Sequence, residues 1–381
     1  MNICIFSPIY PSNESALGKF VHEQAKELAV KNRIFLITIA NKNDKEYEVI
    51  DNVYVYRLKS SKIMLLIKFV KKFYYLNKKY KFNIFHSHFV GFSTLIFGIT
   101  SKVFRIPYVV SVHGMELISN NRLSFLMKKL CMSFPDRIIC VSRYVALMAK
   151  KYVSNKKLVF IPNGVDVEKL KPNKNRNKFK KELNIKYEKI LLSICNLVER
   201  KGLDIVIKAF HQASQKIPNI VYFIIGKGPE KENLVNLVKQ LNLSDKVRFI
   251  NYVSDEDLAN FYNICDIFVL MSRTIREKAG IEGFGVVYIE ASYFGKPVIG
   301  GKSGGTADSI INEVTGYRIE PTNQKELSNK IIKLLKDASL RKKLGNNGKK
   351  RVKTKLLWKH NIDKLIKIYQ SLIKVQEAIN L

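Results

Sequence analysis

Acidic residues are scarce in this sequence: 32 Asp and Glu stand against 66 Lys and Arg among 381 residues, which gives a formal net charge of +34 at pH 7. A charge of this size predicts a polyanionic partner, such as nucleic acid, an anionic membrane face or a phosphorylated substrate. Composition alone does not choose among these three classes.

Cysteines and long apolar runs are also few. The five cysteines include no Cys-x-x-Cys pair, so we expect neither a zinc knuckle nor a disulfide framework. The longest uncharged apolar run, 82–101, contains two histidines and two glycines, so we expect no membrane span. The first residues have neither a basic region nor a long apolar stretch, which argues against a signal peptide. We therefore expect a soluble, cytoplasmic protein.

The chain has ample apolar material, with 46% hydrophobic and 11% aromatic residues, and its length suggests two domains. Strand-length apolar runs alternate with helix-length segments, which predicts an α/β protein with parallel sheets covered by helices on both faces. The predicted strands of the first half are 3–7, 34–40, 53–58, 84–88, 108–113, 137–141 and 158–161; those of the second half are 190–194, 221–225, 247–250, 267–270 and 298–299.

A strong turn at 161–166, Ile-Pro-Asn-Gly-Val-Asp, separates the two halves, and a polar segment at 169–181 follows it. We therefore predict two doubly wound Rossmann-like domains, at 1–165 and 166–355. The helical pattern from 325 onward ends in a final helix at 356–381, expected to cross back to the first domain. Ligands of such sheets bind at the carboxyl ends of strands, so a central cleft between facing domains is the expected site.

The most informative stretch is 282–291, Glu-Gly-Phe-Gly-Val-Val-Tyr-Ile-Glu-Ala. Its glycines precede an amphipathic helix, whose free backbone N–H groups can receive an anion such as a diphosphate. Of its two carboxylates, Glu282 and Glu290, one could hold sugar hydroxyls and the other a ribose. The alternative is an ordinary capped helix with solvated glutamates.

Further motifs follow other predicted strands of the second half. They are Arg200-Lys201-Gly202 after 190–194, where two cations can neutralise phosphates, Gly226-Lys227-Gly228 after 221–225, and Ser303-Gly304-Gly305-Thr306 after 298–299. Together with 282–291, these motifs resemble the C-terminal half of the family-4 retaining glycosyltransferases of GT-B fold, which transfer sugar from nucleotide-sugar donors. The resemblance extends from Leu191 to about Pro321.

The first half resembles the same family more weakly. The stretch from Pro11 to Gly18 is similar to the family's glycine-bearing first loop, which approaches the donor diphosphate. Phe85-His86-Ser87-His88 is similar to its Ile-His-Ala-His strand end, and Val112-His113-Gly114 to its His-Gly loop. His86 and His88 could instead satisfy loop carbonyls.

The resemblance implies an acceptor-binding first domain and a donor-binding second domain. It implies that His113, Lys201 and Glu282 serve catalysis, with Lys201 on the diphosphate, Glu282 on sugar hydroxyls and His113 against the sugar. The donor-binding residues implied are Gly18, Asn196, Arg200, Lys201, Gly226, Val253, Glu282, Phe284, Gly285, Val286 and Glu290. No metal and no cofactor is expected, because lysine, amide dipoles and a helix N-terminus can stabilise a departing nucleotide diphosphate. No Asp-x-Asp motif stands directly at a strand end.

Two departures from the common family pattern bear on substrates. Asn196 occupies a position where the family commonly carries an arginine, and an asparagine cannot replace a guanidinium fork. Arg200 could supply the missing charge. The insertion at 272–281 resembles a subset of the family that glycosylates phospholipid or polyprenyl-linked acceptors.

Basic residues concentrate in the first half, where 52–115 contains eleven Lys and Arg and no acidic residue. Within it, 63–80 alternates apolar residues with lysines at helical spacing, as in an interfacial helix. We expect its lysines to meet an anionic membrane face, namely Lys68, Lys71, Lys72, Lys78 and Lys79, with Phe69, Phe73, Tyr74 and Tyr75 among them. The alternative is a core helix with a solvated lysine face.

Three functions are compatible with these observations. We expect an anomer-retaining hexosyltransferase that acts on a lipid-linked or cell-surface-polysaccharide acceptor, peripherally on the inner face of the plasma membrane. A nucleic-acid-binding protein would fit the charge, but the sequence lacks an RNP strand, zinc spacing or a recognition-helix signature. The third function is an epimerase or another non-transferase on the same scaffold.

Overall fold

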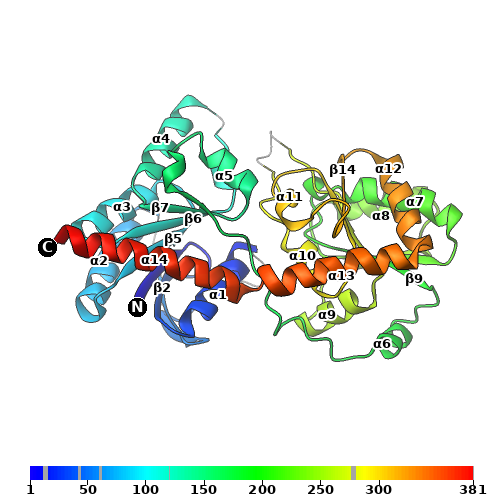
Figure 1. Ribbon diagram of the computed structural model, residues 1–381, viewed down its shortest axis with the longest axis horizontal. Helices are drawn as coiled ribbons and strands as arrows, with labels where there is room; N and C mark the ends of the chain where they lie inside the picture. The colour runs from blue at the N-terminus through cyan, green and yellow to red at the C-terminus, as the bar shows by residue number, and fades with distance from the viewer. Residues whose placement is uncertain (12–15, 42–43, 60–61, 120, 276–279, 381) are drawn as a thin grey trace. The chain divides into compact units, whose positions relative to one another are not determined.

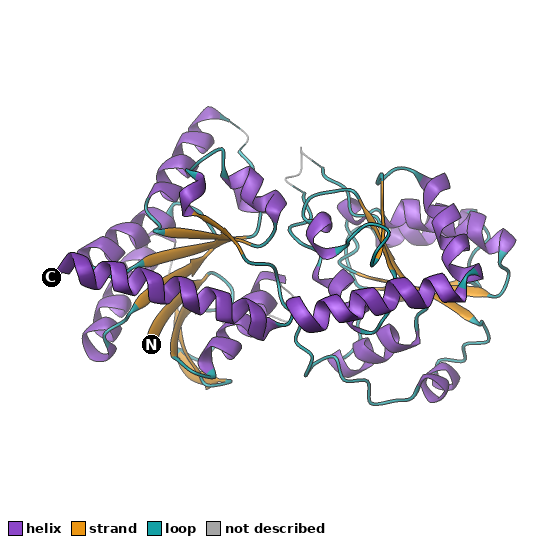
Figure 2. Cartoon of the chain, viewed as in Figure 1, coloured by secondary structure: helices purple, strands orange, loops and turns teal. Residues whose placement is uncertain are grey.

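The computed structural model describes residues 1–11, 16–41, 44–59, 62–119, 121–275 and 280–380 (Figures 1 and 2). The chain forms two compact units: Met1–Asn163 with Trp358–Leu381, called the N-terminal unit, and Gly164–Leu357, called the C-terminal unit. The sequence predicted the boundary between the two domains after residue 165 and the start of the final helix at 356. In the structure the boundary follows Asn163 and the final segment begins at Trp358. The prediction of two parallel-sheet domains is confirmed.

The N-terminal unit is built on a sheet of eight strands in the order β3-β4-β2-β1-β5-β6-β7-β8. All neighbours pair in parallel except β3 with β4. The strands are β1 (Asn2–Ser7), β2 (Arg33–Ile39), β3 (Tyr47–Ile50), β4 (Val53–Leu58), β5 (Ile84–His88), β6 (Tyr108–Val112), β7 (Arg137–Cys140) and β8 (Leu158–Phe160).

Helices cover both faces of this sheet, because alternate strand residues point to opposite sides. Ile3 and Ile5 of β1 share a core cluster with residues of α1 (Ala16–Ala29) and α14 (Trp358–Asn380). Cys4 and Phe6 of the same strand pack on the other side with residues of α2 (Lys62–Tyr80) and α3 (Ser93–Phe104). The remaining helices are α4 (Arg122–Ser133) and α5 (Arg143–Ala149), with 3₁₀ turns at Met115–Leu117 and Asn155–Lys157.

The C-terminal unit has six parallel strands in the order β11-β10-β9-β12-β13-β14 around one continuous core. The strands are β9 (Lys189–Ile194), β10 (Ile220–Ile225), β11 (Val247–Ile250), β12 (Ile267–Leu270), β13 (Val298–Gly301) and β14 (Gly316–Ile319). The helices are α6 (Arg176–Glu182), α7 (Leu203–Lys216), α8 (Lys231–Gln240), α9 (Asp255–Ile264), α10 (Val286–Tyr293), α11 (Thr306–Ser309), α12 (Gln324–Lys336) and α13 (Ala338–Lys355), with a 3₁₀ turn at Glu199–Lys201.

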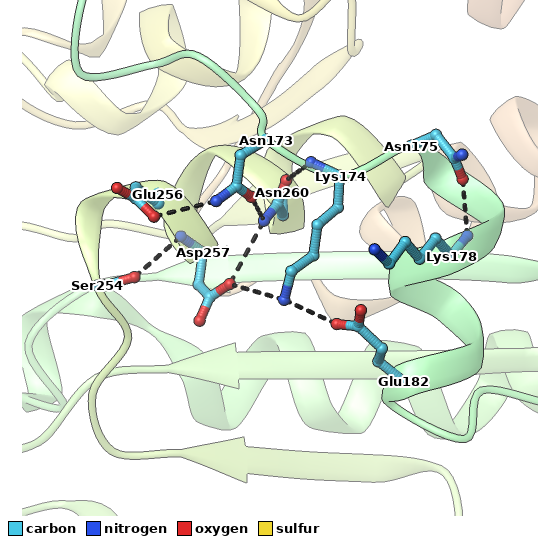
Figure 3. A network of polar contacts seen from close by, with 9 residues as sticks. All are labelled: Asn173, Lys174, Asn175, Lys178, Glu182, Ser254, Glu256, Asp257 and Asn260. Carbon is cyan, nitrogen blue, oxygen red and sulfur yellow. Dashed lines mark hydrogen bonds and ion pairs between the residues drawn. The ribbon is translucent and has the colours of Figure 1, made fainter.

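The polar segment expected as a linker is fastened to α9 by side-chain contacts (Figure 3). The buried Asn260 amide donates to Asn173 Oδ1 at 2.8 Å, and its carbonyl accepts from the Lys174 backbone N–H at 3.2 Å. Lys174 Nζ lies 2.7 Å from Glu182 and 3.8 Å from Asp257. These contacts hold Asn173 and Lys174, near the start of the C-terminal unit, against α6 and α9.

Candidate active site

The C-terminal sheet reverses its strand order at β9, which lies between β10 and β12. The connections after β9 and β12 therefore leave in opposite directions, and ligands of doubly wound sheets bind at such switch points. Arg200 and Lys201 follow β9, whereas Ser272 and Glu282 follow β12. The topology thus brings the predicted cations and the first predicted carboxylate to one edge of the sheet.

Glu282 is held there by a buried cluster of charges. Its Oε2 atom lies 2.5 Å from Lys201 Nζ and 3.7 Å from Arg200 Nη1, and it accepts a hydrogen bond from Ser272 Oγ at 3.0 Å. Burial alone would raise the pKa of the Glu282 carboxyl, but the charges of Lys201 and Arg200 and these hydrogen bonds outweigh burial and lower that pKa. Glu282 is therefore a carboxylate at neutral pH.

The position of Glu282 depends on the glycines after β13. The Gly305 N–H donates to the Glu282 carbonyl at 2.7 Å. A Cβ atom on Gly304 would lie 2.2 Å from that carbonyl oxygen, and one on Gly305 would lie 2.0 Å from the Gly283 oxygen. Only glycines permit this close approach of the two loops. The Ser303–Thr306 motif thus supports the loop that carries Glu282.

Helix α10 begins directly after the Gly283–Gly285 stretch, as the sequence predicts. Gly285 has φ +86°, and Phe284 beside it is buried, whereas Val286 is half-buried. Glu290, one turn into α10, accepts a hydrogen bond from Tyr262 Oη of α9 at 2.7 Å. Tyr262 and Ser272, whose hydroxyls orient the two predicted carboxylates, were not among the residues predicted from sequence motifs.

The other predicted donor-binding residues of this unit lie at the same edge. Asn196 is exposed just after β9, and Arg200 points to Glu282 and the Ile281 carbonyl rather than to Asn196. Gly226, with φ +143°, follows β10 and fits against Cys195, whose oxygen would lie 1.9 Å from an added Cβ. Val253 is half-buried after β11.

The insertion at 272–281 is described only in part, since 276–279 lie outside the described residues. Arg273 Nη1 binds Asp204 Oδ2 at 3.1 Å, and the Arg273 N–H donates to the Arg200 carbonyl. The start of the insertion is thereby tied to the turn that carries Lys201. The predicted first loop of the N-terminal unit likewise includes 12–15, outside the described residues, while Gly18 is buried in α1.

The three histidines predicted at strand ends form a stack in the N-terminal unit. The ring centroids of His86 and His88 are 4.6 Å apart, and those of His88 and His113 are 5.9 Å apart. Phe20 packs edge-on against His113 at 4.8 Å. Among the described residues, no hydrogen-bond partner meets either ring nitrogen of His88 or Nε2 of His113.

Burial keeps this histidine stack neutral. It lowers the pKa of His113 to about 4, and burial together with the neighbouring His113 lowers that of His86 to about 3. The pKa of His88 falls well below its usual value for the same reasons. His86 is further fixed by Ser111 Oγ at 2.8 Å and Tyr369 Oη at 2.5 Å. Within the described ranges no group of three or more His, Cys, Asp or Glu could hold a metal ion.

Helix α2 has one buried and one exposed face. Phe69 and Phe73 lie in the core, so the sequence analysis was wrong to place them on a lipid-facing surface. The exposed face carries Tyr74 (52% exposed) and Tyr75 (61%), together with Lys68, Lys71, Lys78 and Lys79. Lys72 is half-buried, with Nζ 5.4 Å from the centre of the Tyr56 ring. No helix in the described part of the chain is both long and apolar enough to cross a bilayer.

Comparison with known proteins agrees with this architecture. Among solved structures, Anabaena Alr3699/HepE in complex with UDP superposes with a TM-score of 0.81 at 18% identity, covering 97% of this chain and 100% of that one, which shows the fold alone. The two units define the GT-B fold of glycosyltransferases.

Sequence comparison identifies the family. Family models match at residues 17–169, "Glycosyltransferase Family 4", and at 174–351, "Glycosyl transferases group 1". The capsular polysaccharide biosynthesis glycosyltransferase CapM of Staphylococcus aureus is 30% identical over 297 residues, 75% of each chain. A GDP-mannose-dependent monoacylated alpha-(1-6)-phosphatidylinositol monomannoside mannosyltransferase of Corynebacterium glutamicum is 29% identical over 286 residues, 73% of each chain. The chain belongs to the group 1 glycosyltransferases.

Proposed function

We propose that this chain transfers a hexose from a nucleotide-diphosphate sugar to a lipid-linked or cell-surface-polysaccharide acceptor, with retention of anomeric configuration and without a metal or cofactor. The observation that carries the proposal is the cluster of the buried Lys201 and Glu282 with the half-buried Arg200 beside the start of α10. It offers two cations and one carboxylate at the switch point of a sheet, where a sugar diphosphate needs all three.

The chemical demand is to stabilise a departing nucleoside diphosphate while the anomeric carbon becomes oxocarbenium-like. Lys201 and Arg200 neutralise the diphosphate, and the backbone N–H groups around Phe284, Gly285 and Val286 add the dipole of α10. An ammonium group has three donors, so Lys201 can bind a phosphate oxygen and Glu282 at once. The proposal also assigns Gly18 to the donor diphosphate.

The sugar and nucleotide contacts follow from the same arrangement. The Glu282 carboxylate accepts hydrogen bonds from the sugar hydroxyls, and Glu290, oriented by Tyr262, holds the ribose. Asn196, Gly226 and Val253 line the nucleotide along the neighbouring strand ends. His113, neutral and half-buried, is assigned to the sugar and can hydrogen-bond to it without adding charge.

The N-terminal unit also docks on the anionic inner face of the plasma membrane in this proposal, and the acid-free surface of α2 supports it. Exposed apolar side chains continue onto the neighbouring helices, with Ile99 and Val103 on α3 and Leu123, Leu126 and Leu130 on α4. Basic residues beside apolar ones suit an interface between water and anionic lipid.

The test is a panel of nucleotide sugars assayed for slow hydrolysis and thermal shift. GDP-mannose and UDP-glucose come first, because one relative is named as GDP-mannose-dependent and HepE was solved with UDP; ADP-glucose follows. Hydrolysis of at least one donor supports the proposal, and neither hydrolysis nor a thermal shift with any would refute it. A radiolabelled donor then separates transfer from epimerisation through the product formed.

A further inference from the structure

A cavity of about 540 Å³ lies in the N-terminal unit at the carboxyl ends of β1 and β5. Phe6 and Pro8 contribute to it from the end of β1, and His88 from the end of β5. The first turns of α2 and α3 line it as well. Its volume falls within the range of about 300–1,000 Å³ that is usual for small-molecule sites.

The lining is almost entirely apolar and dominated by phenylalanines: Phe6, Phe69, Phe89, Phe92 and Phe97, which we call the phenylalanine pocket. Phe97 packs against Phe6 at 4.6 Å and against Phe69 at 4.5 Å between ring centroids. No charged residue occurs among the described lining residues, and His88 and Ser93 are the polar ones. A sugar in this space would lose its hydrogen bonds to water, whereas a hydrocarbon chain would not.

Two of these phenylalanines are exposed to solvent. Phe92 is 63% exposed and Phe89 42%. Phe89 also has φ +93°, an outlier for a bulky residue, and such strained conformations cluster at ligand-binding and active sites. Apolar side chains held in this way at the mouth of an apolar cavity mark a binding surface rather than a packing defect.

We propose that the phenylalanine pocket binds the hydrocarbon chain of a lipid-linked acceptor. This inference rests on the proposed function and narrows its acceptor from lipid or polysaccharide to lipid. The pocket reaches His88, whose ring lies 5.9 Å from that of His113, so a bound chain places its polar end near the residue assigned to the sugar. Helix α2, which lines the pocket through Leu65 and Leu66, carries exposed lysines suited to a lipid phosphate.

The test is calorimetric titration of the full chain with inorganic phosphate, butyl phosphate and decyl phosphate, below the concentration at which decyl phosphate aggregates. Affinity is expected to rise about fourfold for each buried methylene group until the pocket is filled. Because monomeric decyl phosphate forms no bilayer, this rise reports on the pocket and not on membrane docking. Equal affinity for the butyl and decyl compounds would overturn the proposal.

Single substitutions test whether decyl phosphate binds in the phenylalanine pocket. Phe92→Ser removes an exposed ring from the mouth, and Leu66→Gln places an amide in the lining; each is expected to weaken decyl phosphate binding about tenfold or more. Leu147→Ser is the matched control, since it removes an exposed apolar side chain from α5 of the same unit, outside both the pocket and the surface proposed to meet the membrane. Unchanged decyl phosphate binding by folded Phe92→Ser would refute the assignment.

Donor hydrolysis by the wild-type chain distinguishes failure of the pocket proposal from failure of the proposed function. A chain-length dependence with neither hydrolysis of nor a thermal shift by any sugar nucleotide would leave the pocket supported and the proposed function refuted. Hydrolysis without a chain-length dependence would refute the pocket alone.

Discussion

Lys201 Nζ lies 2.5 Å from Glu282 Oε2 although 81 residues separate them in sequence, and both side chains are only 11% exposed. The sequence assigned these residues separate tasks, one on the diphosphate and one on the sugar. Because they form a pair, each holds the other in place before a donor arrives, which lowers the cost of orienting groups during the reaction. The loss of either residue therefore affects both tasks.

Glu282→Gln is expected to lower turnover by about 10²–10³-fold, because a neutral amide cannot match the carboxylate's electrostatic stabilisation. Glu282 lies in the loop between β12 and α10. Its burial against two cations now predicts a lower thermal midpoint as well, since a buried cation loses its partner. Glu199→Gln, on the exposed neighbouring turn, is the control. Wild-type turnover in Glu282→Gln would contradict the role.

Lys201→Ala is expected to weaken binding of the nucleoside diphosphate about 10–150-fold, the value of about 1.5–3 kcal/mol for a charge-assisted hydrogen bond. Arg200→Ala should weaken it less, because the Arg200 side chain is 24% exposed against 11% for Lys201, so solvent screens its charge more. Calorimetry with GDP and UDP measures both. If Lys201→Ala binds the diphosphate as tightly as wild type, the ammonium does not contact it.

Glu290→Ala should mainly raise the donor KM, because a ribose contact exists in both the ground state and the transition state. Tyr262→Phe provides a graded companion, since it removes only the 2.7 Å hydrogen bond that orients Glu290. It should shift KM in the same direction by a smaller factor. Steady-state kinetics with varied donor concentration measures KM and turnover for both variants. A turnover defect in Glu290→Ala with an unchanged donor KM would contradict a ribose contact.

The sheet strands could be predicted because most are β-branched or aromatic runs buried on both faces. Two strands, β3 and β14, were missed. Tyr47–Ile50 alternates exposed and half-buried residues at an edge, so no apolar run marks it, and Gly316–Ile319 is a four-residue edge strand that begins with a glycine and contains an arginine. The Asp51-Asn52 pair could have indicated a turn, because Asp and Asn tolerate positive φ. In the structure both residues have positive φ and close a tight hairpin between β3 and β4.

The site could be predicted motif by motif but not as contacts. A single sequence places Lys201 after the predicted strand 190–194 and Glu282 after 267–270, yet their pairing depends on these strands being neighbours in the sheet, which the pattern does not give. The support that Gly304 and Gly305 give to Glu282 is hidden for the same reason. Likewise, the helical period of α2 shows two faces without showing that Phe69 and Phe73 belong to the inner one.

The histidine stack should make the N-terminal unit sensitive to acid. The pKa values of His86 and His113 fall from 6.5 to about 3 and about 4, so between these values and 6.5 the unfolded chain binds protons that the native one does not. This contribution to stability is present above pH 6.5 and decreases as the pH falls, by about 1.4 kcal/mol per pH unit for each histidine.

Fluorescence of Trp358, the single tryptophan, measures this effect, because Trp358 is buried in the N-terminal unit against Phe20. Urea midpoints should fall from pH 7 to pH 5. His86→Gln should make that decrease shallower, whereas His211→Gln in the C-terminal unit should leave it unchanged. Midpoints independent of pH over this range would show that the stack does not remain neutral.

The membrane proposal predicts that the chain sediments with vesicles containing anionic phospholipid and not with neutral ones. Binding should weaken with salt, because the Debye length shrinks from about 30 Å at 0.01 M to about 3 Å at 1 M. Changing the exposed Lys68, Lys71, Lys78 and Lys79 to glutamine should remove about 4 kcal/mol, or about 10³-fold in binding, at about 1 kcal/mol for each lysine. The half-buried Lys72 should add less.

A matched control tests whether position or total charge matters. The variant with Lys342, Lys343, Lys349 and Lys350 changed to glutamine loses the same charge from exposed positions on α13 of the C-terminal unit. If α2 is the docking surface, this control keeps nearly all of its vesicle binding, because a surface potential acts within a Debye length and only the lysines facing the lipid feel it. Equal losses in the two variants would mean that net charge alone attracts the chain. Binding unaffected by the α2 substitutions would mean that its lysines are only a solvated face.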